Sequence, residues 1–173
     1  MPFTPLHMGP GMVVKAALQR HFSIVVFGLT QIAIDLEVLW HLARHEYPLH
    51  TFCHTYLGAT IIAALLTVLG KPLSQLIKSA WNRVATNCHK TDLTVSVQTT
   101  WVASFTGASI GAYSHILLNS IYHGDICPLQ PWSASNQLYQ MVSPDSVDVT
   151  CVLLGIIGLA WFIARQRIRK KAG

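Results

Sequence analysis

Histidines and acidic residues recur in three separate stretches of the chain, at spacings that place their side chains on common helix faces. Asp35 and Glu37 lie inside an apolar run, where an ionisable group is costly and usually functional. Histidines four residues apart share one face, because a helical turn holds 3.6 residues. In chain order the residues concerned are Asp35, Glu37, His50, His54, His115, Asn119, His123 and Asp125.

These groups together predict a metal site. Imidazole and carboxylate suit zinc, manganese and iron, so we expect one or two divalent ions, zinc first, with manganese or iron as the alternatives. Two ions about 3.5–4 Å apart are the usual arrangement in phosphatases and nucleases. The expected metal ligands are His7, Asp35, Glu37, His50, His54, His115 and His123. The expected catalytic residues are Asp125, as a ligand or base, and Asn119, which orients a ligand or the substrate.

Each of these side chains also has a simpler interpretation when it is taken singly. A histidine such as His41 or His45 can be an interfacial or hydrogen-bonded residue, and Asp35 can bind a backbone group. The convergence of several segments is what favours a metal or proton-handling site.

The elements that must position these groups are membrane helices. The 173-residue chain is 51% hydrophobic and only 11% charged, whereas soluble domains carry about 25% charged residues. A spanning helix needs about 20 apolar residues. The sequence predicts an all-α integral membrane protein, one domain over residues 1–173, with spans at about 21–42, 55–77, 101–122 and 149–164.

The basic residues give this protein an orientation. With four spans, all 12 Lys and Arg residues except Arg44 fall on one side. The positive-inside rule makes that side cytoplasmic, so the N-terminal basic residues and the C-terminus are expected in the cytoplasm of a bacterial-type inner (plasma) membrane. The basic tail then contacts anionic lipid. Membrane lipids are the expected partners, nucleic acid is not, and the oligomeric state stays open.

Two further helices are expected beside the spans. A helix over residues 7–19 that turns back near residues 20–22 would be re-entrant or half-spanning, and would bring His7 to the depth of Asp35, because each residue rises 1.5 Å. The alternative is a flexible cytoplasmic N-terminus with His7 exposed. Residues 73–86 have an apolar face and predict a helix on the cytoplasmic interface. Gly107 and Gly111 form a GxxxG pair, which fits close helix packing.

The cysteines and one pair of histidines could in principle belong to other kinds of metal site. Cys53, Cys88, Cys127 and Cys151 form no CxxC pair, which argues against a structural zinc knot. Cys53 and Cys127 flank site histidines and can be ligands, a disulfide or small apolar residues. The stretch from His45 to His50 resembles the zincin HExxH motif, but it is one residue too long and contains Pro48, so we reject that interpretation.

An ordered set of motifs also points to a family. Thr-Pro-x-His occurs at residues 4–7, an acidic pair at Asp35 and Glu37, and His-x3-His at residues 50–54 followed by Gly58. The longest motif runs from Gly111 through His115 to Asn119, and a loop with Pro128 and Pro131 follows. On these residues the chain resembles the membrane-bound metal-dependent hydrolases typified by a LexA-regulated, SOS-induced bacterial inner-membrane protein.

This chain departs from the motifs of the family at three places, and the resemblance still implies a function. The family usually has Asp where this chain has Asn119, its second acidic residue is Glu37 here, and the usual Arg-Gly between the two histidines is absent. We expect a membrane-embedded metal-dependent hydrolase, with its site at the outer face, acting on an amphiphilic or phosphoester substrate. The alternatives are a metal or proton transporter and a non-enzymatic membrane protein with a structural metal.

Overall fold

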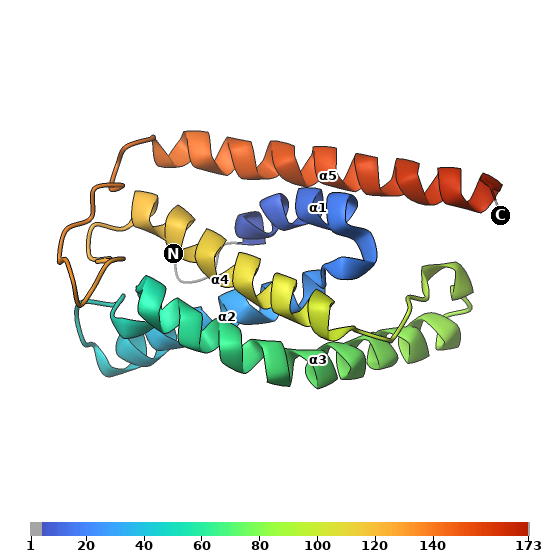
Figure 1. The fold of residues 1–173 in the computed structure, drawn as a ribbon, viewed down its shortest axis with the longest axis horizontal. Coiled ribbons are helices and arrows are strands. Elements are labelled where there is room, and N and C mark those ends of the chain that lie inside the picture. The colour runs from blue at the N-terminus through green and yellow to red at the C-terminus, as the bar shows by residue number, and fades with distance from the viewer. Residues whose placement is uncertain (1–4, 173) are drawn as a thin grey trace.

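The computed structural model describes residues 5–172, without the side chains of Pro5, Asp92 and residues 169–172; Thr4 of the N-terminal motif lies outside the described residues. The described part is helical and contains no strand, as expected for an all-α chain. Five α-helices follow one another: α1 (Met8–Leu18), α2 (Ile24–Arg44), α3 (Tyr56–Asn87), α4 (Trp101–Tyr122) and α5 (Pro144–Ala172) (Figure 1).

Helices α2, α3 and α4 form a bundle in which α4 packs against both of the others. Its core is built from small and branched apolar side chains: Val26, Ile34, Ala59, Ala63, Leu66, Ala108, Ala112 and Ile116. The GxxxG pair lies at the contact between α4 and α2, where a Cβ on Gly107 would lie 2.6 Å from the carbonyl oxygen of Ser23 and one on Gly111 would lie 2.8 Å from that of Phe27. Glycine is required here because any side chain would push the two helices apart.

The N-terminal segment forms the expected helical hairpin with α2. After α1, a short 3-10 turn over Gln19–His21 reverses the chain, and Gln19 adopts a positive φ of 50°. The Nζ of Lys15 donates to the carbonyl oxygens of Gln19 and Phe22 at 2.7 and 2.9 Å, which closes the turn. Ser23 caps α2 by accepting a hydrogen bond from the amide of Val26. The hairpin returns His7 to the level of the polar residues of α2.

The last helix packs chiefly on α1 rather than on the bundle (Figure 1). A Cβ on Gly9 would lie 1.9 Å from the carbonyl oxygen of Cys151, and one on Gly158 would lie 2.5 Å from the amide of Val13. Small residues therefore allow the backbones of α1 and α5 to approach closely, as they do between membrane helices. Near its start, α5 also meets α4, where the hydroxyl of Tyr122 bonds the carboxylate of Asp148.

Three of the described helices, α2, α3 and α5, are long and apolar enough to span a membrane. Helix α4 has the expected bounds, and its 22 residues would rise about 33 Å, but it is not among the three. Its buried polar residues face its neighbours, as when Ser104 donates to the carbonyl oxygen of Thr67 at 2.7 Å. The structure thus identifies a protein with membrane-span-like helices, while the count of four spans stays a prediction.

The structure corrects the boundary expected for an interfacial helix. Residues 73–86 are not a separate element, because α3 continues through Pro72 for 32 residues. The extension is held by the linker that follows it: Ser74 bonds Thr99 at 2.8 Å, and Asn82 exchanges two hydrogen bonds with Val95. These contacts hold the segment in line with α3, which the apolar pattern alone did not reveal.

Candidate metal centre

Two groups of histidine and aspartate side chains lie at the end of the bundle where α2 and α4 finish, which we call the site end. Each group has ligand atoms that all lie within 4.8 Å of one another. The first, cluster A, contains Asp35, His54 and His115, all buried, and the second, cluster B, contains His50, His123 and Asp125. Helices α2 and α4 and the loops next to them therefore bring together residues from three parts of the sequence, as predicted.

Cluster A has the spacing of ligands around one ion. The Oδ1 of Asp35 lies 3.2 Å from Nε2 of His115 and 3.6 Å from Nε2 of His54. In a tetrahedral zinc site, ligand bonds of about 2.0–2.1 Å separate neighbouring ligand atoms by about 3.3–3.4 Å. These two separations bracket that edge, so Asp35 stands at the spacing of neighbouring metal ligands from each of the two histidines.

Several ring nitrogens in this region are buried and lack a hydrogen-bond partner. They are Nε2 of His7, Nε2 of His54 and Nδ1 of His115. Leaving a buried polar atom unpaired costs about 1–3 kcal/mol. A metal ion in cluster A would accept the lone pair of Nε2 of His54, which faces Asp35. It would not bind Nδ1 of His115, because the other nitrogen of that ring, Nε2, is the one that faces Asp35. The ring of His7 lies 5.6 Å from that of His115, between centroids, which places it beside cluster A.

Glu37 occupies a different place from the one expected for a ligand. One of its oxygens accepts hydrogen bonds from Thr51 Oγ1 at 2.6 Å and the amide of Cys53 at 2.9 Å. The other accepts from the amide of Thr51 at 3.0 Å and from Nδ1 of His54 at 3.1 Å. Both oxygens are thus engaged, and Nδ1–H of His54 is fixed. A carboxylate that accepts from one ring nitrogen of a histidine orients the other ring nitrogen toward a metal.

The electrostatics of His54 favour a cation at its Nε2. Burial alone would lower the pKa of His54, yet hydrogen bonds to Asp35 and Glu37 raise it. The two carboxylates therefore favour positive charge on or beside this ring. The same two negative charges would stabilise a divalent ion at Nε2.

Cluster B repeats the arrangement of a carboxylate behind a histidine. The Oδ2 of Asp125 accepts from Nδ1 of His50 at 2.9 Å, and from the amides of Leu49 and His50 at 3.2 and 3.3 Å. The ring of His123 lies 4.3 Å from that of His50. Burial lowers the pKa of His123 to about 4, and the neighbouring His50 contributes. Burial also lowers the pKa of His50, against the opposing effect of Asp125. Both rings are therefore neutral near pH 7, which is the form that binds metal.

The two clusters are adjacent. The rings of His50 and His54 stand edge to face with their centroids 4.6 Å apart, one from each cluster. The arrangement can accommodate two neighbouring ions, or one ion in cluster A with cluster B beside it.

Asn119 is buried one turn beyond His115. Its Nδ2 lies 2.8 Å from Nε2 of His115, the same atom that faces Asp35. The amide N–H of Asn119 donates to the lone pair of Nε2, which a metal in cluster A would need, so a bound metal would displace this contact. The expected role of Asn119, to orient a ligand or the substrate, stays a prediction.

The remaining histidines of this region and the cysteines lie outside the two clusters. His41 bonds Glu46 at 3.0 Å, and the exposed His45 caps α2 with a positive φ of 56°, so His45 and His50 do not form a zincin pair. The four cysteines are free, and Cys127 donates to the carbonyl oxygen of Ala134.

Sequence reasoning missed two residues next to the site. Thr51 binds Glu37 twice, and Tyr122 lies between His7 and Asp148, with its ring 6.1 Å from that of His7. For the pair of Tyr122 and Asp148, the only signal in the sequence was an acidic residue at the start of the last apolar run.

Comparisons of the chain with protein-family models, with curated proteins and with solved structures found no match in any of the three.

Proposed function

We propose that this chain is a membrane-embedded metal-dependent hydrolase that acts on an amphiphilic or phosphoester substrate. The observation that carries the proposal is cluster A: a buried carboxylate and two buried imidazoles whose ligand atoms lie within 4.8 Å of one another, with Nε2 of His54 lacking a hydrogen-bond partner. The sequence resemblance to membrane-bound metal-dependent hydrolases supports the same function.

The proposed topology has four spans, α2 to α5, with α1 half-spanning. Helix α4 can cross despite its polar residues, because protein rather than lipid surrounds four of them, Ser104, His115, Asn119 and Ser120. The basic residues gather at the opposite end from the clusters, so the positive-inside rule places that end in the cytoplasm and the site at the outer face of a bacterial-type inner membrane.

The chemistry proposed for the site follows from its donors. A bound divalent metal would lower the pKa of a water and polarise the scissile group. Asp35, His54 and His115 would hold the ion, Glu37 would fix the orientation of His54, and Asn119 would orient a ligand or the substrate. Asp125 is the candidate base or further ligand. Zinc is our first choice, because nitrogen and oxygen donors at about tetrahedral spacing suit it.

A transporter is the weaker alternative. A relay would need ionisable groups that continue from Asp35 toward the basic end, but the residues of α2 before Asp35 include none. On α2, Thr30 bonds the carbonyl oxygen of Val26, and on α4 Ser104 bonds that of Thr67. Gln31 is the polar side chain of α2 nearest to Asp35, and its buried Nε2 has no hydrogen-bond partner among the described residues, but an amide does not ionise. A structural metal is the other alternative, and hydrolytic turnover separates it from an enzyme.

The test is metal analysis of the purified protein, followed by a screen of phosphoester and lipid hydrolysis. His115→Ala should lose the metal of cluster A and any activity. His21→Ala is the matched control, because His21 is exposed at the opposite end of the bundle. A wild-type protein that binds no divalent metal would refute the proposal.

A further inference from the structure

Helices α1, α2 and α4 meet around Phe27 of α2. A Cβ on Gly11 of α1 would lie 2.7 Å from the ring of Phe27, and one on Gly111 of α4 would lie 2.8 Å from its carbonyl oxygen. Helix α4 runs in the same direction as α2, because Gly107 packs on Ser23, four residues earlier on both helices. The hairpin makes α1 run in the opposite direction. One turn toward the site end is therefore four residues forward on α2 and α4, and four residues back on α1.

That step leads to a polar residue on each of the three helices: His7 at the start of α1, Gln31 on α2 and His115 on α4. His7 has a right-handed helical backbone, with φ −62° and ψ −13°, so the step along α1 holds for it. The rings of His7 and His115 lie edge to face with their centroids 5.6 Å apart, in agreement with a common level. We call His7, Gln31 and His115 the polar layer.

Each residue of the polar layer is buried and has a nitrogen without a hydrogen-bond partner among the described residues. The exposed fractions are 3%, 4% and 2% for His7, Gln31 and His115. The atoms are Nε2 of His7, Nε2 of Gln31 and Nδ1 of His115. Buried polar groups that lack a protein partner usually bond to an ordered water, which makes about three such bonds. Three unpartnered nitrogens from three helices match the needs of one water.

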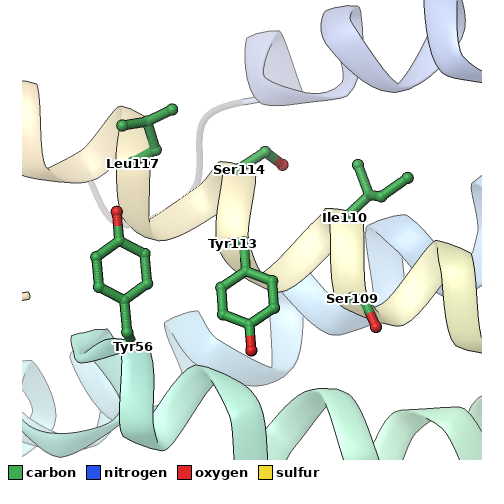
Figure 2. Close-up of a pocket in the computed structure, with 6 residues that line it drawn as sticks. All are labelled: Tyr56, Ser109, Ile110, Tyr113, Ser114 and Leu117. Carbon is green, nitrogen blue, oxygen red and sulfur yellow. The ribbon is translucent and has the colours of Figure 1, made fainter.

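The opposite face of α4 differs from the polar layer. There, residues of α3 and α4 line an apolar groove, and Figure 2 shows Tyr113 and Ser114 among them. The hydroxyl of Tyr113 bonds Thr60 Oγ1 at 2.8 Å, and Ser114 donates to the carbonyl oxygen of Gly111 at 3.3 Å. These hydroxyls thus have protein partners, whereas Nδ1 of His115 on the buried face has none among the described residues.

The hydrogen-bonding roles of the three nitrogens fit a water molecule. Nε2 of Gln31 can only donate. Nδ1 of His115 also donates, because the amide N–H of Asn119 donates to Nε2 of that ring and leaves the ring hydrogen on Nδ1. A metal on Nε2 would leave it there too. Nε2 of neutral His7 can accept. One water accepts two hydrogen bonds and donates a third, whereas an anion has no hydrogen for His7 and a cation would face two donors.

We propose that the polar layer holds one buried water, and that Gln31 is a positioning residue, which fixes the ring of His115 through this water. The Nε2 of that ring faces Asp35 in cluster A. Histidines that bind a metal usually donate their other ring N–H to a carboxylate, a carbonyl oxygen or a water, and no described residue supplies such an acceptor to Nδ1 of His115. The positioning role rests on the proposed metal centre, and the water site itself does not.

The water site is tested by a double-mutant cycle on the chelated full-length protein in detergent. Gln31→Met keeps the length of the side chain and removes its amide, and His7→Phe keeps a ring and removes its nitrogens. Each change takes a partner from the water, so each should lower the melting temperature. The double variant should melt close to the less stable single variant, because residues that share one partner are not additive.

Two results of this cycle would overturn the water site. An amide that simply lacks a partner is unfavourable when buried, so a higher melting temperature for Gln31→Met would show that Gln31 binds no water. Additive effects of Gln31→Met and His7→Phe would show that the two residues share no partner. Thr30→Val is the control for the cycle, because the hydroxyl of Thr30 bonds the carbonyl oxygen of Val26 on its own helix. Its effect should add to that of His7→Phe.

The positioning role is tested on the zinc-loaded protein. Gln31→Met should lower metal affinity about tenfold, at the lower end of the usual cost of losing such a partner, and Thr30→Val should leave it unchanged. In ¹⁵N NMR spectra of histidine-labelled protein, Nδ1–H of His115 should show a cross-peak to a bound water, which Gln31→Met removes. A lower affinity with an unchanged cross-peak would show that Gln31 acts only through packing.

The two proposals fail in different ways. A wild-type protein that binds no divalent metal but shows coupling between Gln31 and His7 would keep the water site and refute the hydrolase function. A protein that binds metal but shows additive effects would keep the metal centre and refute the water site.

Discussion

Glu37 accepts a hydrogen bond from Nδ1 of His54 at 3.1 Å, and this bond turns Nε2 of the same ring toward Asp35. Glu37 would therefore act on a metal in cluster A through His54. Glu37→Gln keeps the size of the side chain but removes its charge, so we expect metal affinity to fall by about 10–100-fold, the usual cost of losing such a partner. Competition with a metal-binding indicator measures the change.

The matched control for Glu37 is Glu46→Gln. Glu46 also contacts a histidine, His41, but that pair lies outside both clusters. Equal metal affinity in the two variants would show that Glu37 does not support the site.

The number of ions follows from comparing the two clusters. His115→Ala removes a ligand from cluster A and should abolish its ion. His123→Ala removes a ligand from cluster B, and we expect it to lose about half of the metal, because His50 and Asp125 alone offer too few donors. Elemental analysis of purified variants gives the stoichiometry. Full metal content in His115→Ala would exclude α4 from the site, and full content in His123→Ala would leave one ion in cluster A.

Asn119→Asp places a carboxylate near Asp35 and His115. Without metal, the added buried charge should lower the melting temperature, since like charges near each other are unfavourable. With metal, the variant should retain or strengthen binding, and binding to the folded state raises stability. The gap between the melting temperatures of the loaded and chelated protein should therefore be wider than in the wild type. A narrower gap would contradict the assigned role of Asn119.

The packing of α1 on α5 depends on Gly9. Gly9→Ala would place a Cβ 1.9 Å from the carbonyl oxygen of Cys151, and overpacking of this kind costs about 1–3 kcal/mol. Gly155→Ala in the same helix pair is the control, because its Cβ would lie 3.4 Å from Gly9 in ordinary contact. Thermal unfolding in detergent compares the two, and equal stability would show that the two helices separate without cost.

The four-span topology predicts on which side of the membrane a reporter fused to the chain will be active. Fusions after Lys90 and after Gly173 should read cytoplasmic, and a fusion near Gln137 should read external, because all the basic residues except Arg44 lie on one side of a four-span protein. Activity measurements of paired cytoplasmic and external reporters check this. An external C-terminus would refute the four-span arrangement.

The sequence predicted much of this fold because helical periodicity sets which residues lie at one depth. The meeting of His7 with the polar residues of α2 follows from counting residues in a hairpin, and the one-turn step from His115 to Asn119 follows from 3.6 residues per turn. These are local regularities, which survive when the tertiary structure is unknown.

What the sequence did not predict depends on backbone direction in loops and on contacts far apart in the chain. Two amide groups of the loop after α2 bind Glu37, and no side-chain pattern encodes where an amide N–H points. The continuation of α3 through Pro72 depends on hydrogen bonds to the following linker. The pairing of α5 with α1 joins glycines at opposite ends of the sequence, Gly9 and Gly158.

Helix α1 lies between the bundle and α5, so the two ends of the chain together determine the position of His7. His7 stands beside cluster A on a segment whose following helix is bound to α5 through Gly9. Asp35, His54 and His115 are fixed by the bundle itself. Removal of α5 would therefore leave the three residues of cluster A in place but release His7. A helix that carries none of the candidate ligands thus holds one of them in position.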